Sequence, residues 1–178
     1  MQKIYEKVSL RDFSERDIEN KIEWINNPAN NTYLHYEIPL NYDKTLQWFL
    51  NKDNSKRVDC IIEYEGEPVG VIGLLAIDNQ NSKAEYYITV GNEKYKNRGI
   101  ATKASFLLLE YAFNDLFLNK VYLNVDADNE IACKLYEKIG FLCEGVFCED
   151  MKRNDYYIDR KRYSFLRKNW NDGWRTND

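Results

Sequence analysis

The chain has 178 residues, a length that suits a single globular domain with one hydrophobic core. Its residues are 44% hydrophobic, 30% charged and 15% aromatic, a composition that argues against a disordered, collagen-like or coiled-coil protein. The formal net charge is −4, so the excess of Lys and Arg that is typical of nucleic-acid-binding modules is missing, and we expect no nucleic-acid partner.

The N-terminal part begins with a predicted strand over residues 7–11, in which apolar and polar side chains alternate. A helix is predicted next, because Ser14 can act as its N-cap and isoleucines follow at helical spacing as far as Ile25. Pro28 disfavours helical structure in the residue before it and is therefore expected to end this helix.

The middle of the chain predicts a second helix and three strands. Residues 29–41 are rich in Asn and are expected to be irregular, and Asp43 is the predicted cap of the helix that follows. A turn sequence, Glu-Gly-Glu-Pro, separates strands predicted at 58–64 and 69–77. A third strand is predicted at 84–90, with its alternate side chains on opposite faces of the sheet.

The C-terminal half predicts two helices that flank a strand. A largely apolar helix is expected at 99–113 and a strand at 120–125. The second helix is expected from Asn129, a favourable N-cap, to Gly140, which suits the left-handed residue at a helix C-terminus. Two further strands are predicted, within residues 141–148 and 156–165.

This order of elements predicts an α+β (mixed α/β) fold rather than a doubly wound parallel sheet. The expected architecture is a central, mostly antiparallel, twisted sheet of about seven strands flanked by about four helices. Residues 1–170 are predicted to form one domain and residues 171–178 a polar C-terminal tail.

The distribution of apolar and cysteine residues predicts a cytoplasmic protein without a membrane partner. The N-terminus shows no signal-peptide pattern, and no segment reaches the ~18 consecutive apolar residues of a membrane span. The four cysteines form no Cys-x-x-Cys pair and are expected to be reduced thiols. Together with a single histidine they give no zinc spacing, so we expect no metal.

The segment 96–102, Lys-Asn-Arg-Gly-Ile-Ala-Thr, lies between a predicted strand and a predicted buried helix. Gly99 permits close approach of the backbone to a ligand, and the first N–H groups of a helix have no partners within it. Together with the basic side chains of Lys96 and Arg98, these groups would suit an anion such as a pyrophosphate. An ordinary polar turn before a helix explains the same residues, and the segment lacks the Walker A pattern.

A second pattern follows one strand later and combines a helix N-cap, a core stripe and a glycine stop. It runs Asn-x-x-Ala-x-x-Leu-Tyr-x-Lys-x-Gly-Phe from Asn129 to Phe141. Taken alone, it requires only a capped amphipathic helix with Tyr136 packed in the core.

Together the two segments resemble the signatures of the GNAT N-acetyltransferase superfamily, in which an Arg/Gln-x-x-Gly-x-Gly/Ala loop binds the pyrophosphate of acetyl-CoA. Gly99 and Ala101 match this loop, whereas Lys96 stands where Arg or Gln is usual. The resemblance implies a GNAT-like sheet and acetyl-CoA as the acetyl-donating cosubstrate. The residues expected to bind it are Ile88, Val90, Lys96, Asn97, Arg98, Gly99, Ile100, Ala101, Thr102, Asn124, Asn129 and Tyr136.

The length, the segment Trp24–Pro28 and the helix after Asp43 resemble one branch of this superfamily, which holds ribosomal-protein N-terminal, spermidine and sugar-nucleotide N-acetyltransferases. Many members carry Arg where this chain has Asn26. The resemblance implies an enzyme that moves an acetyl group directly to a primary amine in a ternary complex. The acceptor is expected to be a peptide N-terminus, a polyamine or an amino-sugar nucleotide.

Two residues are the candidates for catalysis. In the family a Tyr at the position of Tyr136 commonly protonates the sulfur of CoA, so Tyr136 is the predicted general acid; a phenol with a pKa of about 10 holds its proton at neutral pH. Glu85 is the possible general base, the alternative being a strand carboxylate in an ion pair or in solvent.

The variable first third is expected to build the acceptor pocket, with Tyr33, His35, Glu37 and Tyr86 as candidate substrate-binding residues. Two other functions stay open: a catalytically silent acyl-CoA-binding sensor or partner module on the same fold, and an unrelated α+β binding domain with accidental motif matches. The branch also implies a possible homodimer, to which the strand at 156–165 could contribute.

Overall fold

The computed structural model describes residues 1–34 and 36–170, so His35 and the predicted tail at 171–178 lie outside the described residues. The strands are β1 (Gln2–Tyr5), β2 (Val8–Asp12), β3 (Val58–Tyr64), β4 (Glu67–Asp78), β5 (Lys83–Val90), β6 (Lys120–Asp126), β7 (Leu142–Arg153) and β8 (Tyr156–Leu166). The α-helices are α1 (Ile18–Asn26), α2 (Pro28–Asn31), α3 (Tyr42–Asn51), α4 (Ile100–Glu110) and α5 (Glu130–Ile139). Shorter helical turns are η1 (Glu15–Asp17), η2 (Glu93–Tyr95), the π-turn η3 (Tyr111–Asp115) and η4 (Arg167–Asn169).

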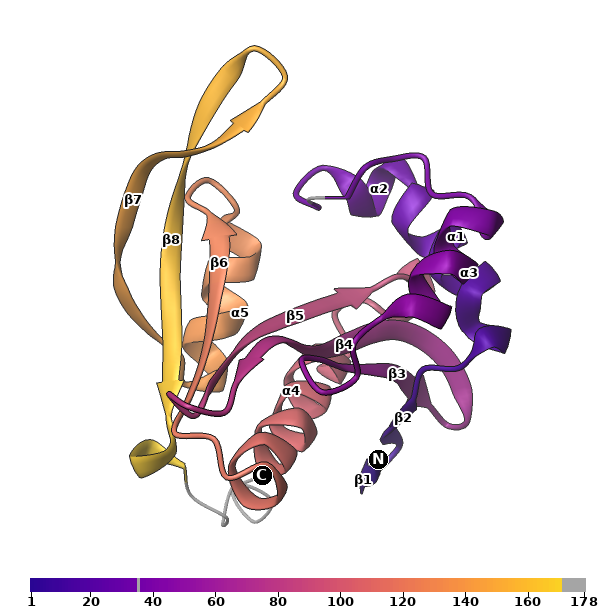
Figure 1. Ribbon diagram of the computed structural model, residues 1–178, viewed down its shortest axis with the longest axis horizontal. Coiled ribbons are helices and arrows are strands. Elements are labelled where there is room, and N and C mark those ends of the chain that lie inside the picture. The colour runs from indigo at the N-terminus through magenta and orange to yellow at the C-terminus, as the bar shows by residue number, and fades with distance from the viewer. Residues whose placement is uncertain (35, 171–178) are drawn as a thin grey trace.

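The strands form one sheet in the order β1-β2-β3-β4-β5-β6-β8-β7 (Figure 1). All neighbouring strands pair antiparallel except β5 and β6, which confirms the predicted mixed fold with a mostly antiparallel sheet. The parallel pair is short: Lys83–Glu85 of β5 pair with Lys120–Tyr122 of β6. Beyond this contact the two strands diverge, as Figure 1 shows, and the sheet splits into two arms.

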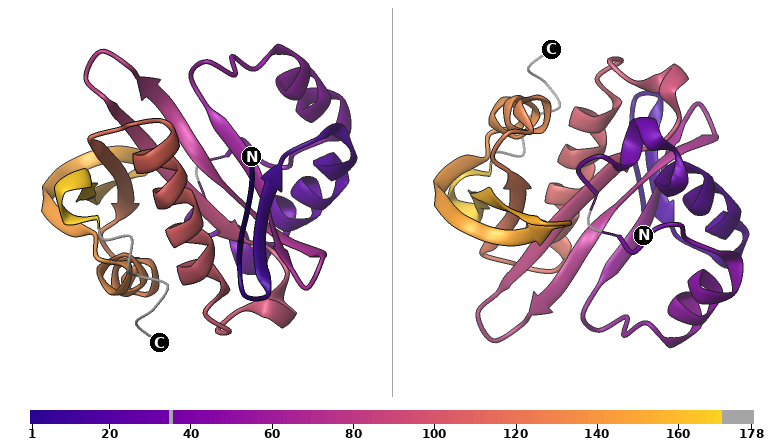
Figure 2. Two further views of the ribbon diagram at one scale, coloured as in Figure 1. Left: turned by 90° about the horizontal axis from the view of Figure 1, so that it is seen from below. Right: turned by 90° about the horizontal axis from the view of Figure 1, so that it is seen from above.

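Alternation along the central strands sends apolar side chains to both faces of the sheet. Ile62 and Ile72 join the larger core, which packs on α4 and α5, whereas Ile61 and Val71 join a second core beneath α1 and α3. Figure 2 shows α4 and the pair of α1 and α3 on opposite faces. Because both faces are covered, the strands read as nearly continuous apolar runs rather than as strict alternation.

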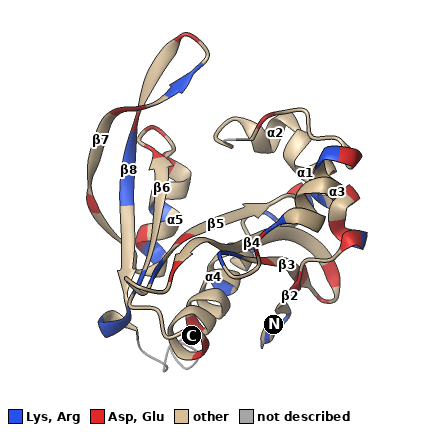
Figure 3. Ribbon diagram, viewed as in Figure 1, with Lys and Arg blue, Asp and Glu red and all other residues tan. Residues whose placement is uncertain are grey.

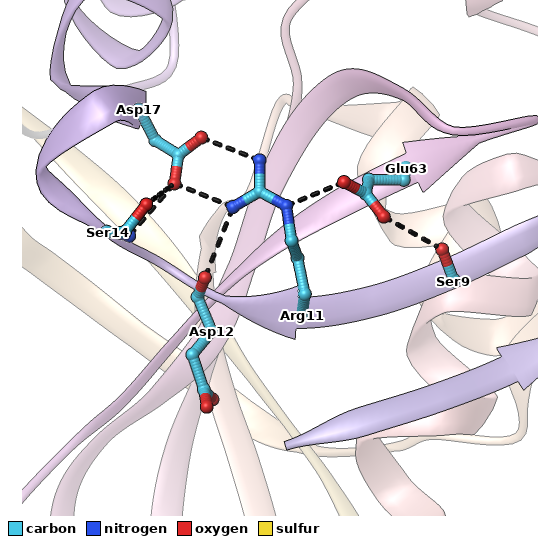
Figure 4. A network of polar contacts seen from close by, with 6 residues as sticks. All are labelled: Ser9, Arg11, Asp12, Ser14, Asp17 and Glu63. Carbon is cyan, nitrogen blue, oxygen red and sulfur yellow. Dashed lines mark hydrogen bonds and ion pairs between the residues drawn. The ribbon is translucent and has the colours of Figure 1, made fainter.

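An ion-pair network fixes the start of α1 against the sheet (Figure 4). The guanidinium of Arg11 donates to both oxygens of Asp17, each at 2.7 Å, and its Nε donates to Glu63 at 2.6 Å. The backbone N–H and the hydroxyl of Ser14 also donate to Asp17. Burial alone would raise the pKa of Asp17, but the hydrogen bonds from Arg11 and Ser14 lower it below its ordinary value. This network fixes the start of α1 on the face of the sheet that carries the second core.

The structure corrects several predicted details. The described residues form eight strands where about seven were expected, because β1 is a short edge strand with little apolar content. It has five α-helices rather than about four, because α2 lies in the segment predicted to be irregular: Pro28 ends α1 and also starts α2, with Asn27 as its cap. The cap of α3 is Asn41, which accepts from the Lys44 N–H at 2.9 Å, so Asp43 lies in the first turn. Strand β7 also extends five residues beyond the predicted limit of 148.

Two further findings concern the compartment prediction. In the part of the chain that the structure describes, no helix is both long enough and apolar enough to cross a membrane. All four cysteines are free thiols: Cys60 and Cys133 are buried, and Cys143 and Cys148 are exposed.

Candidate active site

A cleft of about 1140 Å³ lies where β5 and β6 diverge. Its walls come from β5, the C-terminal end of β6, the N-terminal turn of α4, the length of α5 and the segment from α1 to α3. Residues 86–90 of β5 pair with no described strand on the β6 side, so their edge borders the opening. The cleft gathers nearly all the residues that the sequence singled out.

The N-terminus of α4 borders this cleft. Asn97 and Gly99 both adopt left-handed conformations, with φ of 61° and 73°. Apart from Gly99 itself and its chain neighbours, no heavy atom of the described residues lies within 4 Å of the position that a Cβ on Gly99 would occupy. The first backbone bond of the helix runs from the Lys103 N–H to the Gly99 carbonyl, and no described side chain caps the helix. The N–H groups of residues 100–102 are therefore left for a ligand, as at other helix N-termini that bind anions.

The two basic side chains of this loop have different positions. Lys96 lines the cleft but donates to the Asn30 side chain at 2.6 Å, while the amide of Asn30 donates to the carbonyl of Gly91 at 2.8 Å. Lys96 thus connects the loop to α2. Arg98 is exposed over the ring of Tyr95, 5.4 Å from its centroid, and is not among the residues that line the cleft.

Tyr136 on α5 lines the cleft beside two other aromatic rings. Its ring meets those of Tyr86 and Phe141 edge-on, with centroids 6.0 Å away in both cases. Within residues 1–34 and 36–170, the hydroxyl of Tyr136 has no hydrogen-bond partner. Burial raises the pKa of this phenol above its ordinary value. The hydroxyl therefore keeps its proton at neutral pH and is available as a donor.

Tyr86 and Asn129 line the cleft, but their polar atoms serve the fold. Tyr86 is 3% exposed, and its hydroxyl lies 2.6 Å from that of Ser105, which itself donates to the Ala101 carbonyl. Asn129 caps α5 by accepting from the Ala132 N–H at 3.2 Å. The placement of Tyr86 gives it a core role and supplies no support for direct contact with a substrate.

Glu85 is held by a chain of hydrogen bonds across three strands. The side-chain amide nitrogen of Asn124 on β6 donates to Glu85 Oε1 at 3.1 Å, and Arg162 Nε on β8 donates to the side-chain oxygen Oδ1 of Asn124 at 3.1 Å. Arg162 belongs to a run of basic residues, 160–162, visible in the middle of β8 (Figure 3). Asn124, which was predicted to bind the cosubstrate, thus orients Glu85. Among the described residues, no group forms a hydrogen bond with the second carboxylate oxygen of Glu85, Oε2.

The remaining predicted acceptor residues lie on the segment between α2 and α3. Tyr33 and Glu37 both line the cleft. Tyr33 is 37% exposed, with the guanidinium of Arg153 6.0 Å from its ring centroid, and Glu37 forms a 3.8 Å ion pair with Lys44. His35 cannot be placed, because it lies outside the described residues.

Sequence reasoning missed a basic and aromatic cluster in the wall formed by α1, α3 and β3. Lys21 and Arg57 line the cleft beside the ring of Trp48, and Asp59 lies behind them. A signal for Lys21 was present in the sequence. It lies three residues after Ile18 and four before Ile25, so it occupies the apolar stripe of α1 and must be buried.

Comparison with known proteins finds a matching family model and relatives that all carry the name of an acetyltransferase. A family model described as "Acetyltransferase (GNAT) domain" matches residues 7–142. The spermidine N(1)-acetyltransferase of Escherichia coli K12 is 36% identical over 116 residues, which cover 65% of this chain and 59% of that protein. The corresponding enzyme of Vibrio cholerae is 30% identical, covering 82% of this chain and 86% of the relative. The putative ribosomal N-acetyltransferase YdaF of Bacillus subtilis is 28% identical, covering 94% and 96%.

The solved structures agree with the fold. The crystal structure of spermidine N-acetyltransferase from Vibrio cholerae in complex with CoA and spermine superimposes with a TM-score of 0.84 at 25% identity. That match covers 91% of this chain and 96% of the other. By contrast, the alignment with the Escherichia coli relative spans less than two thirds of that relative's length.

Proposed function

The chain belongs to the GNAT acetyltransferase family, and from this premise we propose that it transfers the acetyl group of acetyl-CoA directly to a primary amine. The observation that carries the proposal is a shared cleft: the open N-terminus of α4, the Tyr136 hydroxyl and the Glu85 carboxylate all border it. An anion site, a proton donor and a proton acceptor are what acetyl transfer from a thioester to an amine requires.

The N-terminus of α4 fits the pyrophosphate of acetyl-CoA, because its N–H groups are unpaired and the space over Gly99 is open. Bound acetyl-CoA would supply the activated acetyl group. Residues 96–102, apart from the outward-facing Arg98, are proposed to hold the pyrophosphate. The exposed edge of β5 at Ile88 and Val90 is proposed to donate a backbone N–H to the thioester oxygen.

Two proton transfers would accompany the exchange of a C–S bond for a C–N bond. Glu85 takes the proton that the amine loses as the new bond forms, directly or through a water molecule. Tyr136 gives its phenolic proton to the sulfur as the old bond breaks and regains one from solvent. The hydrogen bond from Asn124 holds the Glu85 carboxylate in place for the first of these transfers.

The names of the relatives suggest which amine to test first. Two of them are spermidine N-acetyltransferases, which makes a polyamine one candidate acceptor, and YdaF makes a peptide N-terminus another. An amino-sugar nucleotide remains the third. Glu37 and Glu85 supply negative charge for a cationic acceptor, whereas the basic cluster around Lys21 favours an acceptor that carries negative charge.

The test is acetyl-CoA-dependent release of thiol with spermidine, ribosomal-protein N-terminal peptides and 4-amino-sugar nucleotides. Turnover with at least one acceptor class supports the proposal, and mass spectrometry of the acetylated product confirms the transferred group. Binding of CoA without turnover would favour the silent sensor. Absence of CoA binding in a titration would overturn the proposal.

A further inference from the structure

A buried lysine without a carboxylate partner stands in the wall of the cleft. Lys21 is 7% exposed and lines the cleft, and its ammonium nitrogen lies 3.4 Å from the centroid of the Trp48 ring. The rings of Tyr36 and Phe13 lie 5.6 and 5.7 Å away. No carboxylate in the described parts of the chain forms an ion pair with it. Aromatic faces attract a cation but replace only part of its lost hydration.

The carboxylate whose charge acts on Lys21 is that of Asp59, and both of its oxygens already accept hydrogen bonds from other side chains. Asp59 accepts from Arg57 at 2.7 and 2.8 Å, from Lys52 at 3.0 Å and from the Tyr87 hydroxyl at 2.7 Å. Three cationic side chains, Lys21, Lys52 and Arg57, therefore lie around one buried carboxylate, which forms ion pairs with Lys52 and Arg57. Arg57 donates to Asp59 through Nε and one terminal nitrogen, so its other terminal nitrogen is not used on this carboxylate.

The sign of charge in the cleft is opposite to that of the whole chain. The chain carries a net charge of −4. Among the described residues that line the cleft, seven are basic, namely Lys21, Lys44, Arg57, Lys96, Lys134, Lys138 and Arg160, and three are acidic, namely Glu37, Glu85 and Asp126. A polycation that entered beside Lys21 would be repelled, whereas an anion would provide the ion-pair partner that Lys21 lacks.

We infer that Lys21 and Arg57, set against the Trp48 ring, bind an anionic group, a carboxylate or a phosphate, that belongs to the acceptor molecule. This inference rests on the proposed function and narrows its acceptor to an amine that also bears a negative charge. The anion would accept charge-assisted hydrogen bonds from the Lys21 ammonium and from the Arg57 terminal nitrogen that does not bind Asp59. The flat faces of Trp48 and Tyr36 would pack against the apolar or ring portion that joins this anion to the amine.

Electrostatics supports the geometry. Burial, with the nearby positive charges of Arg57 and Lys52, lowers the pKa of Lys21 to about 8, against a raising effect of Asp59. Lys21 is therefore mostly charged at neutral pH while it lacks a counter-ion. An anion that binds there is favoured because it relieves this unpaired charge.

The test compares Lys21→Met with wild type on matched pairs of acceptors. One pair is an L-amino acid and its amide, and the other is glucosamine 6-phosphate and glucosamine, so the two arms separate carboxylate from phosphate. Met keeps the aliphatic stem against Trp48 and removes only the charge. Lys44→Met is the control, because Lys44 lines the same cleft but its side chain is 73% exposed and pairs with Glu37.

For the anion-bearing member of a pair, Lys21→Met is expected to raise KM about ten- to a hundredfold, the loss typical of one charge-assisted hydrogen bond. The KM of the uncharged member and the affinity for acetyl-CoA should stay unchanged, and Lys44→Met should behave as wild type. Equal effects on both members, or no Lys21-dependent acceptor in the panel, would overturn the anion site.

Calorimetric titration of the same acceptors into CoA-saturated protein separates this inference from the proposed function. Binding that depends on Lys21 without any turnover would uphold the anion site and defeat acetyl transfer. Turnover of spermidine, with an affinity that improves or stays unchanged in Lys21→Met, would uphold acetyl transfer and overturn the anion site.

Discussion

At the scale of single residues, Tyr136 offers a hydroxyl that lines the cleft and keeps its proton at neutral pH, because burial raises its pKa. Tyr136→Phe keeps the ring contacts with Tyr86 and Phe141 and removes one oxygen atom. We expect kcat to fall about 10²- to 10⁴-fold, the usual contribution of a general acid. The affinity for acetyl-CoA, measured by calorimetry, should change by no more than about twofold.

The control for this variant is Tyr163→Phe. The ring of Tyr163 lies 6.2 Å from that of Tyr136, but its hydroxyl donates to Glu137 at 2.8 Å. Removing it should leave kcat near the wild-type value. Equal losses of kcat in the two variants would show that the cluster needs its hydroxyls for packing rather than for proton transfer.

The role of Glu85 as the general base can be tested by comparing a variant of Glu85 with a variant of Asn124, which donates a hydrogen bond to it. Glu85→Gln keeps an acceptor for the Asn124 amide but cannot take a proton, so kcat should fall about a hundredfold or more. Asn124→Ala leaves the carboxylate and removes its orienting bond, and we expect a smaller loss of kcat. A Glu85→Gln variant with the kcat of wild type would reduce Glu85 to a structural residue.

At the scale of elements, the start of α4 depends on one glycine, and the chain offers a matched control for it. Gly99 and Gly66 both have positive φ, 73° and 88°, and both have open space at the Cβ position. Gly66 lies in the turn between β3 and β4 and does not line the cleft. A substituted side chain at either position carries a left-handed backbone penalty of about 1–2 kcal/mol.

Gly99→Glu is therefore expected to lose at least about tenfold in acetyl-CoA affinity, because a carboxylate would stand where the pyrophosphate is proposed to bind. Gly66→Glu should show a similar drop in thermal stability with wild-type affinity. Calorimetric titration and thermal unfolding of both variants check this. Matching affinities in the two variants would remove the pyrophosphate site from α4.

The elements that could be predicted from sequence are those whose signals are local. The alternation of β5 and the cap and glycine stop of α5 are local, and the structure has both where they were expected. Strand β1 exists because β2 pairs with it, and α2 exists because Asn27 caps a turn that a proline opens. Neither element depends on a periodic pattern of apolar residues, so that pattern in the sequence predicted neither of them.

The same distinction between local and non-local signals applies to the candidate site. The loop before α4 and Tyr136 lie in contiguous motifs, so a resemblance could identify them. The cluster around Lys21 joins α1, α3 and β3, segments up to 38 residues apart between Lys21 and Asp59, and only the tertiary structure brings them together. The hydrogen-bonded role of Tyr86 was also hidden, because strand alternation identifies its face but not its Ser105 partner.

At the scale of the whole molecule, the arm of β7 and β8 carries apolar residues that no described part of the chain covers. Leu142, Val146, Phe147, Tyr156 and Tyr157 are 40–62% exposed. Among the described strands β7 pairs only with β8 and is an edge of the sheet, and exposed edges of this kind favour association. The homodimer stays a prediction, and these residues are its expected interface.

Val146→Glu should shift the mass measured by light scattering toward that of one 21.2 kDa chain. The control is Leu50→Glu on α3, at a position 61% exposed and remote in the fold from this arm. Wild-type protein that already has the mass of a single chain at micromolar concentration would contradict the prediction.

The stability of the whole molecule should also depend on pH through Lys21. Its pKa in the folded protein, about 8, lies below the ordinary value of 10.5, so the unfolded chain binds more protons between these values. The penalty for the buried charge is thus complete below about pH 8 and disappears as pH rises toward 10.5. Lys21→Met should raise the free energy of unfolding at pH 7 by about 1–3 kcal/mol, since cation–π contacts offset part of the penalty.

Urea unfolding at several pH values checks this. The advantage of Lys21→Met over wild type should narrow between pH 8 and pH 10.5, while Lys44→Met should stay within about 0.5 kcal/mol of wild type throughout. A variant less stable than wild type at pH 7 would mean that the ammonium on Trp48 supports the fold. If the difference in the free energy of unfolding between Lys21→Met and wild type did not narrow with pH, the charge of Lys21 would not be its cause.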